Sequence, residues 1–188
     1  MTIQVAAGIL AGLMAFIAEG AYIRDILRGA VQPEKWSFVI WTLLSGIFTV
    51  GLISEGGGWA AVNPAVTFIG LAIITGLAFR VGHGDMDRFH QVTLIAVGLG
   101  FTAWVSTDNV LTAVAVAVAV DFAATILVIK KLHDHPNSET MFPWALDAAA
   151  AVVTFAAVPP DAGRAFAYPA WVLFTLVLVM AAISRTNR

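Results

Sequence analysis

The stretch PEKWSFVIW at residues 33–41 has a counterpart in PNSETMFPW at residues 136–144. Each begins with a proline, ends with a tryptophan eight residues later, and follows basic residues that close an apolar run. Placing Pro33 on Pro136 sets an offset of 136 − 33 = 103 residues, which also superposes Trp41 on Trp144. The two stretches are therefore interpreted as one turn and helix entry that occurs twice.

A second pair of segments repeats at nearly the same distance. NPAVTFIGLAIITGLAFR at 63–80 aligns with YPAWVLFTLVLVMAAISR at 168–185 at an offset of 168 − 63 = 105 residues, which places Pro64 on Pro169. A chain rich in Ala, Val and Leu produces apolar matches by chance, so those identities carry no weight. Because proline, tryptophan and basic helix ends coincide at two similar offsets, the pattern favours a duplicated unit of three helices.

The composition indicates an integral membrane protein. Of 188 residues, 60% are hydrophobic and only 12% are charged, whereas soluble domains carry about 25% charged residues. The net charge of −2 gives no reason to expect a nucleic-acid partner. The absence of cysteine excludes disulfides, thiol catalysis and cysteine metal sites. Because the opening apolar run has no basic segment before it, we expect a retained first helix rather than a signal peptide.

Charges and Gly/Pro clusters divide the chain into seven apolar segments, each near the length of about 20 residues that crosses a bilayer. The expected spans are 3–27, 36–54, 60–80, 90–107, 109–130, 140–158 and 165–184. The fourth segment is short and has polar ends. The sequence thus predicts one membrane domain over 1–188, with a first three-helix repeat at 1–82, a linker helix at 90–107 and a second repeat at 109–188.

The basic residues predict the orientation of the spans, because cytoplasmic loops hold the excess of Lys and Arg. Nine of the ten fall on one side of the predicted topology: Arg24, Arg28, Lys35, Arg80, Arg88, Lys130, Lys131, Arg185 and Arg188. Only Arg164 falls on the other side. We therefore expect the N-terminus outside and the C-terminus in the cytoplasm. The first helices of the two repeats then run in the same direction, so the repeats are parallel and joined as 3 + 1 + 3.

With this topology the chain resembles the PQ-loop superfamily, which includes the SWEET sugar transporters and the lysosomal cystine and cationic amino-acid exporters. The resemblance rests on YIRDILRGAVQPEKWSFVIWTLLSG at 22–46 and DFAATILVIKKLHDHPNSETMFPWALD at 121–147, and is closest to small bacterial inner-membrane members. It implies a carrier in a bacterial inner membrane. Family members usually have a hinge proline inside the first helix of each repeat, which this chain lacks. Pro143 is the remaining hinge candidate.

Three acidic residues lie deep within the predicted spans: Glu19, Asp121 and Asp147. Ionisable groups at that depth line a cavity or pair inside the bundle. One interpretation is that they exchange a proton as a pathway opens to either side. The resemblance adds that cystine-exporter-like relatives couple transport to an acid in the fifth helix, a role that Asp121 would fill. The alternative is a structural acid held between helices.

Two tryptophans and one asparagine are candidate substrate-binding residues. Trp41, Trp144 and Asn63 resemble the set that holds the substrate in the sugar-transporting relatives. Each tryptophan also lies where an interfacial aromatic belt is expected. Asn63 precedes Pro64 at a predicted helix start, which is typical of a capping residue. Binding and these structural roles remain open for all three.

The remaining motifs are weaker. His133 and His135 in a loop without cysteine are better explained as solvated side chains than as metal ligands, so we expect no metal and no cofactor. A retinal protein is disfavoured because 165–184 contains no lysine. Gly8 and Gly12 form a small-residue pair that favours packing against another helix or another protomer.

Two functions stay in competition. The first is a carrier for a sugar, amino acid or related small solute, with its site between the repeats near mid-membrane and with proton coupling as one mechanism. The second is an accessory or assembly subunit of a larger membrane complex, which the lack of hinge prolines and the short loops favour. Enzymatic catalysis has little support, because no nucleophile and base are suitably spaced.

Overall fold

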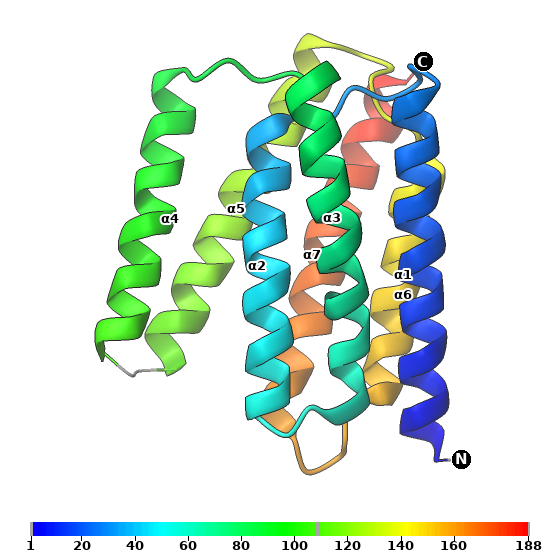
Figure 1. Ribbon diagram of the computed structural model, residues 1–188, viewed down its shortest axis with the longest axis vertical. Coiled ribbons are helices and arrows are strands. Elements are labelled where there is room, and N and C mark those ends of the chain that lie inside the picture. The colour runs from blue at the N-terminus through cyan, green and yellow to red at the C-terminus, as the bar shows by residue number, and fades with distance from the viewer. Residues whose placement is uncertain (1, 108–109, 188) are drawn as a thin grey trace.

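The computed structural model describes residues 2–107 and 110–187. All helices and strands assigned in this part of the chain are helices (Figure 1). The seven α-helices are α1 (Ile3–Leu27), α2 (Lys35–Ser54), α3 (Val62–Val81), α4 (Arg88–Thr107), α5 (Val110–Asp134), α6 (Met141–Ala157) and α7 (Ala167–Thr186). Short 3₁₀ helices, η1 (Gly58–Ala61) and η2 (Gly163–Phe166), precede α3 and α7. The prediction of an all-helical chain with seven helices is confirmed.

The predicted spans agree closely with the helices, and α5 shows the largest difference. It continues to Asp134, whereas the sequence predicted an end at 130. Lys131 and Leu132 are buried inside the bundle, so the last turn of α5 is held by tertiary contacts that the local charge pattern does not reveal. Within residues 2–107 and 110–187, four helical segments are long and apolar enough to cross a membrane, namely Ile3–Leu27, Lys35–Ser54, Gly58–Val81 and Gly163–Thr186.

Two groups of three helices, α1–α3 and α5–α7, show the same pattern of contacts within each group, while the most extensive helix contact, between α1 and α6, joins the two groups. In the first group α3 packs against both α1 and α2, and in the second α7 packs against both α5 and α6. The groups meet where α1 contacts α6 and where α2 contacts α5. The remaining helix, α4, lies at one edge of the bundle beside α5 (Figure 1).

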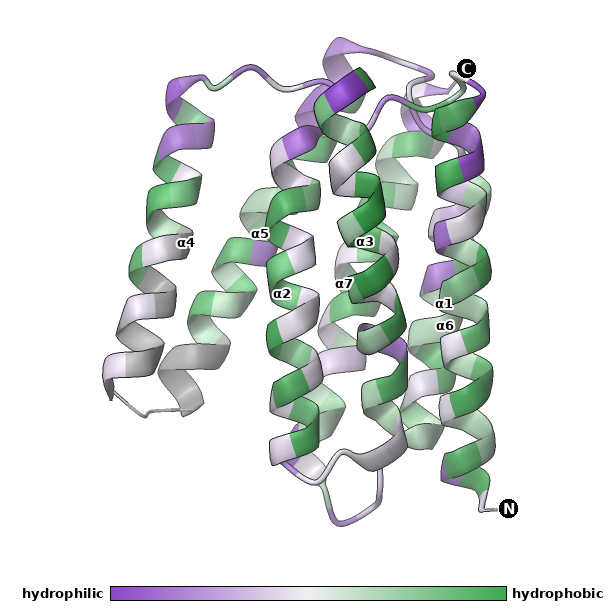
Figure 2. Ribbon diagram, viewed as in Figure 1, coloured by the Kyte–Doolittle hydropathy of each residue, from purple (hydrophilic) through white to green (hydrophobic). Residues whose placement is uncertain are grey.

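Small residues allow α1 to approach its neighbours closely. Ala7, Ala11, Ala15 and Ala18 recur at intervals of four or three and are all buried, which places them on one face of the helix. Gly8 and Gly12 lie against η1 and the start of α3, since an added methyl group would lie 2.7 Å from Trp59 Cβ at position 8 and 2.7 Å from Val62 Cγ1 at position 12. Most of the middle of the bundle is hydrophobic, and hydrophilic residues are most frequent at its ends (Figure 2).

The connections at one end of the bundle are joined by hydrogen bonds. The backbone N–H of Gln32 donates to the carbonyl of Ser138 at 3.2 Å, so the turns before α2 and α6 touch. His83, after α3, exchanges backbone hydrogen bonds with Pro33 and Lys35 at 2.8 and 2.9 Å. The stretches 33–41 and 136–144 are therefore neighbours in space.

Candidate functional site

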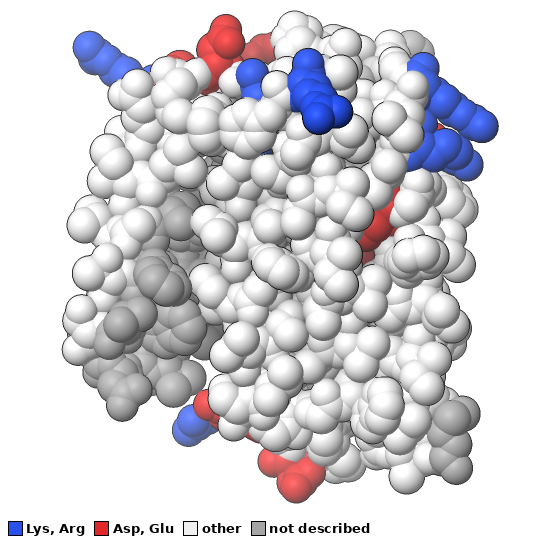
Figure 3. Space-filling view, viewed as in Figure 1, with Lys and Arg blue, Asp and Glu red and all other residues white. Residues whose placement is uncertain are grey.

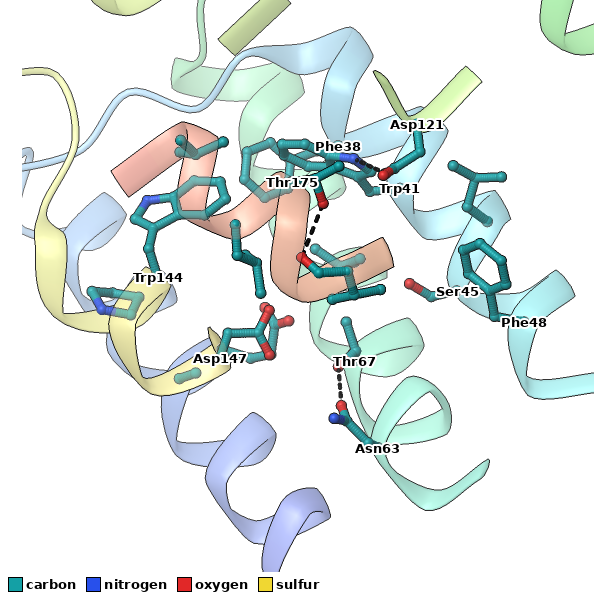
Figure 4. A pocket seen from close by; sticks show the side chains of 18 of the residues that line it. Phe38, Trp41, Ser45, Phe48, Asn63, Thr67, Asp121, Trp144, Asp147 and Thr175 are labelled. Atoms are coloured by element: carbon teal, nitrogen blue, oxygen red, sulfur yellow. Dashed lines mark hydrogen bonds between the residues drawn. The ribbon is translucent and has the colours of Figure 1, made fainter. Parts of the chain in front are cut away.

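A cavity of about 100 Å³ lies between the helices, and α4 is the one α-helix among the seven described that contributes nothing to its wall. All of the residues that sequence reasoning selected as site or hinge residues line this cavity: Glu19, Trp41, Asn63, Asp121, Pro143, Trp144 and Asp147. They come from α1, α2, α3, α5 and α6. The structure thus brings the candidates together (Figure 4), while their roles stay predictions.

Asp121 is held by two indole rings. Trp41 Nε1 donates to one carboxylate oxygen at 2.7 Å, and Trp171 Nε1 donates to the other at 2.6 Å. The side chain is buried, and each of its oxygens has a partner. A buried carboxyl group needs such donors, because burial without them is costly. Sequence reasoning missed Trp171, which reaches Asp121 from α7.

Glu19 and Asp147 form the other acidic part of the wall. They lie on α1 and α6, and they are near enough for their charges to interact. Glu19 is buried against Gly70 of α3, where a methyl group would lie 2.6 Å from Glu19 Cβ. Within residues 2–107 and 110–187, no hydrogen bond to either carboxyl group is found. Both acids are therefore available to a bound group, in contrast to Asp121.

Asn63 lies on the cavity wall and does not cap α3. The helix begins at Val62, and its N-cap position is Ala61, which makes no side-chain cap. The Asn63 amide instead donates to the Thr154 hydroxyl of α6 at 2.7 Å and accepts from Thr67 at 3.3 Å. The capping explanation is wrong, because the preceding 3₁₀ turn places Asn63 one residue inside the helix. Its side chain links α3 to α6 instead.

The two predicted tryptophans contact each other across the cavity wall. The ring centroids of Trp41 and Trp144 are 5.8 Å apart, with planes at 69°, an edge-on arrangement that aromatic pairs favour. Tyr22 packs against Trp144 at 5.9 Å. Trp144 is buried, so an interfacial belt does not explain it. Tryptophans from α2 and α6 thus meet inside the bundle.

Pro143 occupies the first turn of α6, which begins at Met141. The first N–H groups of a helix have no partner within the helix, so a proline there removes no hydrogen bond. Pro143 therefore starts α6 and does not interrupt it. A hinge at this position remains a prediction, and it would operate at the junction of the 135–140 connection with α6.

A buried ion pair adjoins the cavity. Lys131 forms a salt bridge with Glu139, and both side chains are almost completely buried. Glu139 also accepts hydrogen bonds from Tyr22 Oη at 2.8 Å and from Trp144 Nε1 at 3.1 Å. Tyr22 and Trp144 line the cavity, so this network ties the cavity wall to the turn before α6. The sequence carries Lys131 and Glu139 only as members of polar loop stretches, which is why they were not selected.

The minor motifs are placed as follows. Gly8 and Gly12 pack within the chain, against Trp59 and Val62, which favours the interpretation of packing with another helix. His133 is exposed, and the ring of His135 stacks on His83 at 4.0 Å. In the described ranges, no group of three or more His, Cys, Asp or Glu side chains is arranged to hold a metal ion.

Comparison with known proteins gives no relative: no family model, no curated protein and no solved structure matches this chain.

Proposed function

We propose that this chain is an integral membrane carrier for a small solute, with the central cavity as its binding site. The observation that carries the proposal is the composition of that cavity, which gathers carboxyl groups and aromatic rings from both α1–α3 and α5–α7. Buried ionisable groups are expensive inside a membrane and mark pathways for ions or substrates. A site between two packed groups of helices is also where alternating access places a substrate.

The proposed membrane location rests on the outer surface. Large apolar side chains point outward along the helices, including Phe16 at 68%, Ile69 at 62% and Val92 at 64% exposure. An exposed apolar surface of this extent is stable against lipid rather than water. Lys and Arg gather near one end of the bundle in Figure 3, where α1, α3, α5 and α7 end, and the positive-inside rule assigns this end to the cytoplasm.

The matching contacts of the two helix groups support the 3 + 1 + 3 organisation and with it the PQ-loop resemblance. In each group the third helix packs against the first two, and α4 stands outside as a linker. In the proposed cycle, rocking of one group against the other exposes the cavity to alternate sides. Glu139 and Lys131 would then close the cytoplasmic side, because their network ties α1, α5 and the turn before α6.

Uptake by proteoliposomes tests the proposal. The purified chain is reconstituted and offered radiolabelled sugars, amino acids and small amines, with and without an imposed pH gradient. We expect saturable uptake of at least one solute and a loss of roughly tenfold or more in Asp121→Asn, because a group in the transport site is replaced. Asp161→Asn is the matched control, since Asp161 is an exposed acid in the connection between α6 and α7.

The second candidate is an accessory subunit of a membrane complex. The absence of proline within α1 and α5 favours it, because the helices then lack the break that a hinge uses. An accessory subunit would give a different result in the uptake and purification experiments. A chain that transports none of the solutes and co-purifies in stoichiometric amount with another membrane protein is an accessory subunit, and the carrier proposal then fails.

A further inference from the structure

The charged side chains that line the cavity are all acidic. They are Glu19, Asp121 and Asp147, and no Lys, Arg or His is among the described lining residues. The basic residues nearest in the chain to these acids are engaged elsewhere: Arg24 pairs with Asp25, Lys130 with Asp87 and Lys131 with Glu139. Negative charge in a buried site is costly unless a cation compensates it. The cavity therefore favours a positively charged ligand and disfavours an anionic one.

Aromatic faces complete the wall. Trp41 and Trp144 meet on one side, and Tyr168 packs against Phe48 on another, with ring centroids 5.0 Å apart. Aromatic rings attract cations through their negative faces, and tryptophan does so most strongly. Carboxylates beside aromatic rings are thus a combination suited to an organic cation.

Three polar groups on the wall have unused hydrogen-bonding capacity. The hydroxyl of Ser45 is directed into the cavity (Figure 4), and no partner for it is found in the part of the chain that the structure describes. Ser45 and Glu19 are each 8% exposed, and Asp147, which is half-buried, is near enough to Glu19 for their charges to interact. Buried polar groups are normally bonded. A ligand that donates hydrogen bonds would satisfy such acceptors.

These features distinguish between classes of cation. A quaternary ammonium has no N–H to donate, so it would leave the acceptors unpaired. A zwitterionic amino acid brings a carboxylate for which the lining offers no basic partner. A neutral polyol would leave the acids uncompensated, and the Asn63 amide is already bonded to Thr154 and Thr67. At about 100 Å³ the cavity is also below the roughly 300–1,000 Å³ of sites for drug-sized ligands.

We propose that the cavity binds a small primary ammonium cation that carries no carboxylate. The ammonium group donates to Glu19 and Asp147, and the alkyl part contacts the rings of Trp41 and Trp144. This inference rests on the proposed carrier function for its biological meaning, but binding is measured without transport.

Calorimetric titration of the purified full-length chain in detergent tests the proposal. The probe is n-butylammonium chloride, and the controls of similar size are 1-butanol, sodium butyrate and tetramethylammonium chloride, with sodium chloride as the salt blank. We expect n-butylammonium to bind roughly tenfold or more tightly than each control, because it alone offers N–H groups together with charge. Equal affinity for 1-butanol or tetramethylammonium, or no binding of n-butylammonium, overturns the proposal.

Variants locate the site. Asp147→Asn is expected to weaken n-butylammonium binding by roughly tenfold or more, and Glu19→Gln by a similar factor. Glu55→Gln, an exposed acid just after α2, should bind as the unaltered chain does. If Asp147→Asn does not fold, Glu19→Gln decides. Unchanged binding in the folded variants overturns the proposed site.

Measuring transport of n-butylammonium into proteoliposomes separates the proposed ligand class from the proposed carrier function. If n-butylammonium binds but does not cross proteoliposomes, the ligand class stands and the carrier function fails. If another solute is carried and n-butylammonium neither binds nor competes, the carrier function stands and the ligand class fails.

Discussion

The stretches 33–41 and 136–144 enter neighbouring helices, yet each holds its buried glutamate differently. Glu34 caps α2 by accepting from the backbone N–H of Ser37 at 2.6 Å, and its other oxygen lies 3.2 Å from His90 Nε2 of α4. Glu139 precedes α6 and binds Lys131, with Tyr22 and Trp144 as further donors. Both glutamates are 2% exposed.

This difference separates an anchoring role from a coupling role. The first stretch connects α2 to the peripheral helix α4, which does not line the cavity. The second stretch connects α5 and α6 to two rings on the cavity wall. A change at Glu139 should therefore reach the cavity, whereas a change at Glu34 should remain at the end of the bundle.

The largest expected effect comes from Lys131→Met. Removing one partner of a buried ion pair leaves Glu139 with an uncompensated charge, at a cost of about 3–5 kcal/mol. Thermal unfolding in detergent, followed by tryptophan fluorescence, measures the loss of stability. Because Glu139 contacts Trp144, the fluorescence of the folded variant should change as well.

Lys130→Met is the matched control in the adjacent position. Lys130 is exposed and reaches Asp87 at 3.3 Å, and an exposed pair contributes about 0–1 kcal/mol. Equal destabilisation by the two substitutions would contradict the coupling role of the second stretch.

A smaller effect is expected from Glu34→Ala, which removes the cap of α2. Loss of an N-cap acceptor costs about 0.5–2 kcal/mol. Glu34→Gln keeps an oxygen that can accept from Ser37, so it should retain most of this stability. The two variants are compared by the same unfolding measurement. If Glu34→Ala disturbs the cavity as strongly as Lys131→Met does, judged by ligand binding, the two stretches do not differ as described.

The helices and the cavity acids could be predicted from the sequence because each depends on local information. Apolar length identifies a span, and the cost of a buried charge identifies Glu19, Asp121 and Asp147. The helix ends could be predicted wherever a charged residue or a glycine ends an apolar run. The end of α5 did not, since Lys131 is buried by contacts from a segment eight positions away in the chain.

The partners of the acids could not be predicted, because they depend on which faces of distant helices meet. Trp171 reaches Asp121 from a position fifty residues away. Ser45 is one of five hydroxyl side chains in α2, and only the packing of the helix turns it towards the cavity. Asn63 looked like a cap because Pro64 follows it, and the 3₁₀ turn before α3 removed that role.

The smallest expected effect concerns the contact of His83 and His135, which joins the loop at Glu34 to the end of α5. Their rings stack at 4.0 Å. Partial burial lowers the pKa of His83 below 6.5, and the positive charges of His135, Lys131 and Lys35 lower it further, against the opposing charge of Asp85. The same end of the bundle also holds Glu34, His90, Asp87, Lys130 and Asp134.

The sign of the pH dependence follows from this lowered pKa. Above pH 6.5 the ring is neutral in both the folded and the unfolded chain, so there is no penalty. As the pH falls below 6.5 the unfolded chain takes up the proton first, and folding becomes less favourable until the pH passes the folded value. Because the ring is partly exposed and screened by solvent, we expect a fall in Tm of no more than about 2–4 °C between pH 7.5 and pH 5, the change that about 1 kcal/mol gives in a chain of this size.

His135→Gln should flatten this pH dependence, because it removes the neighbouring charge that acts on His83. His133→Gln provides the control, since His133 is two residues away and exposed. A Tm that rises as the pH falls, or an identical pH dependence in both variants, would show that the stacked pair is not what links the two stretches. The stacked rings would then contribute packing but no pH-dependent stability. The connection between the two stretches would depend on the backbone hydrogen bonds of His83 and Gln32.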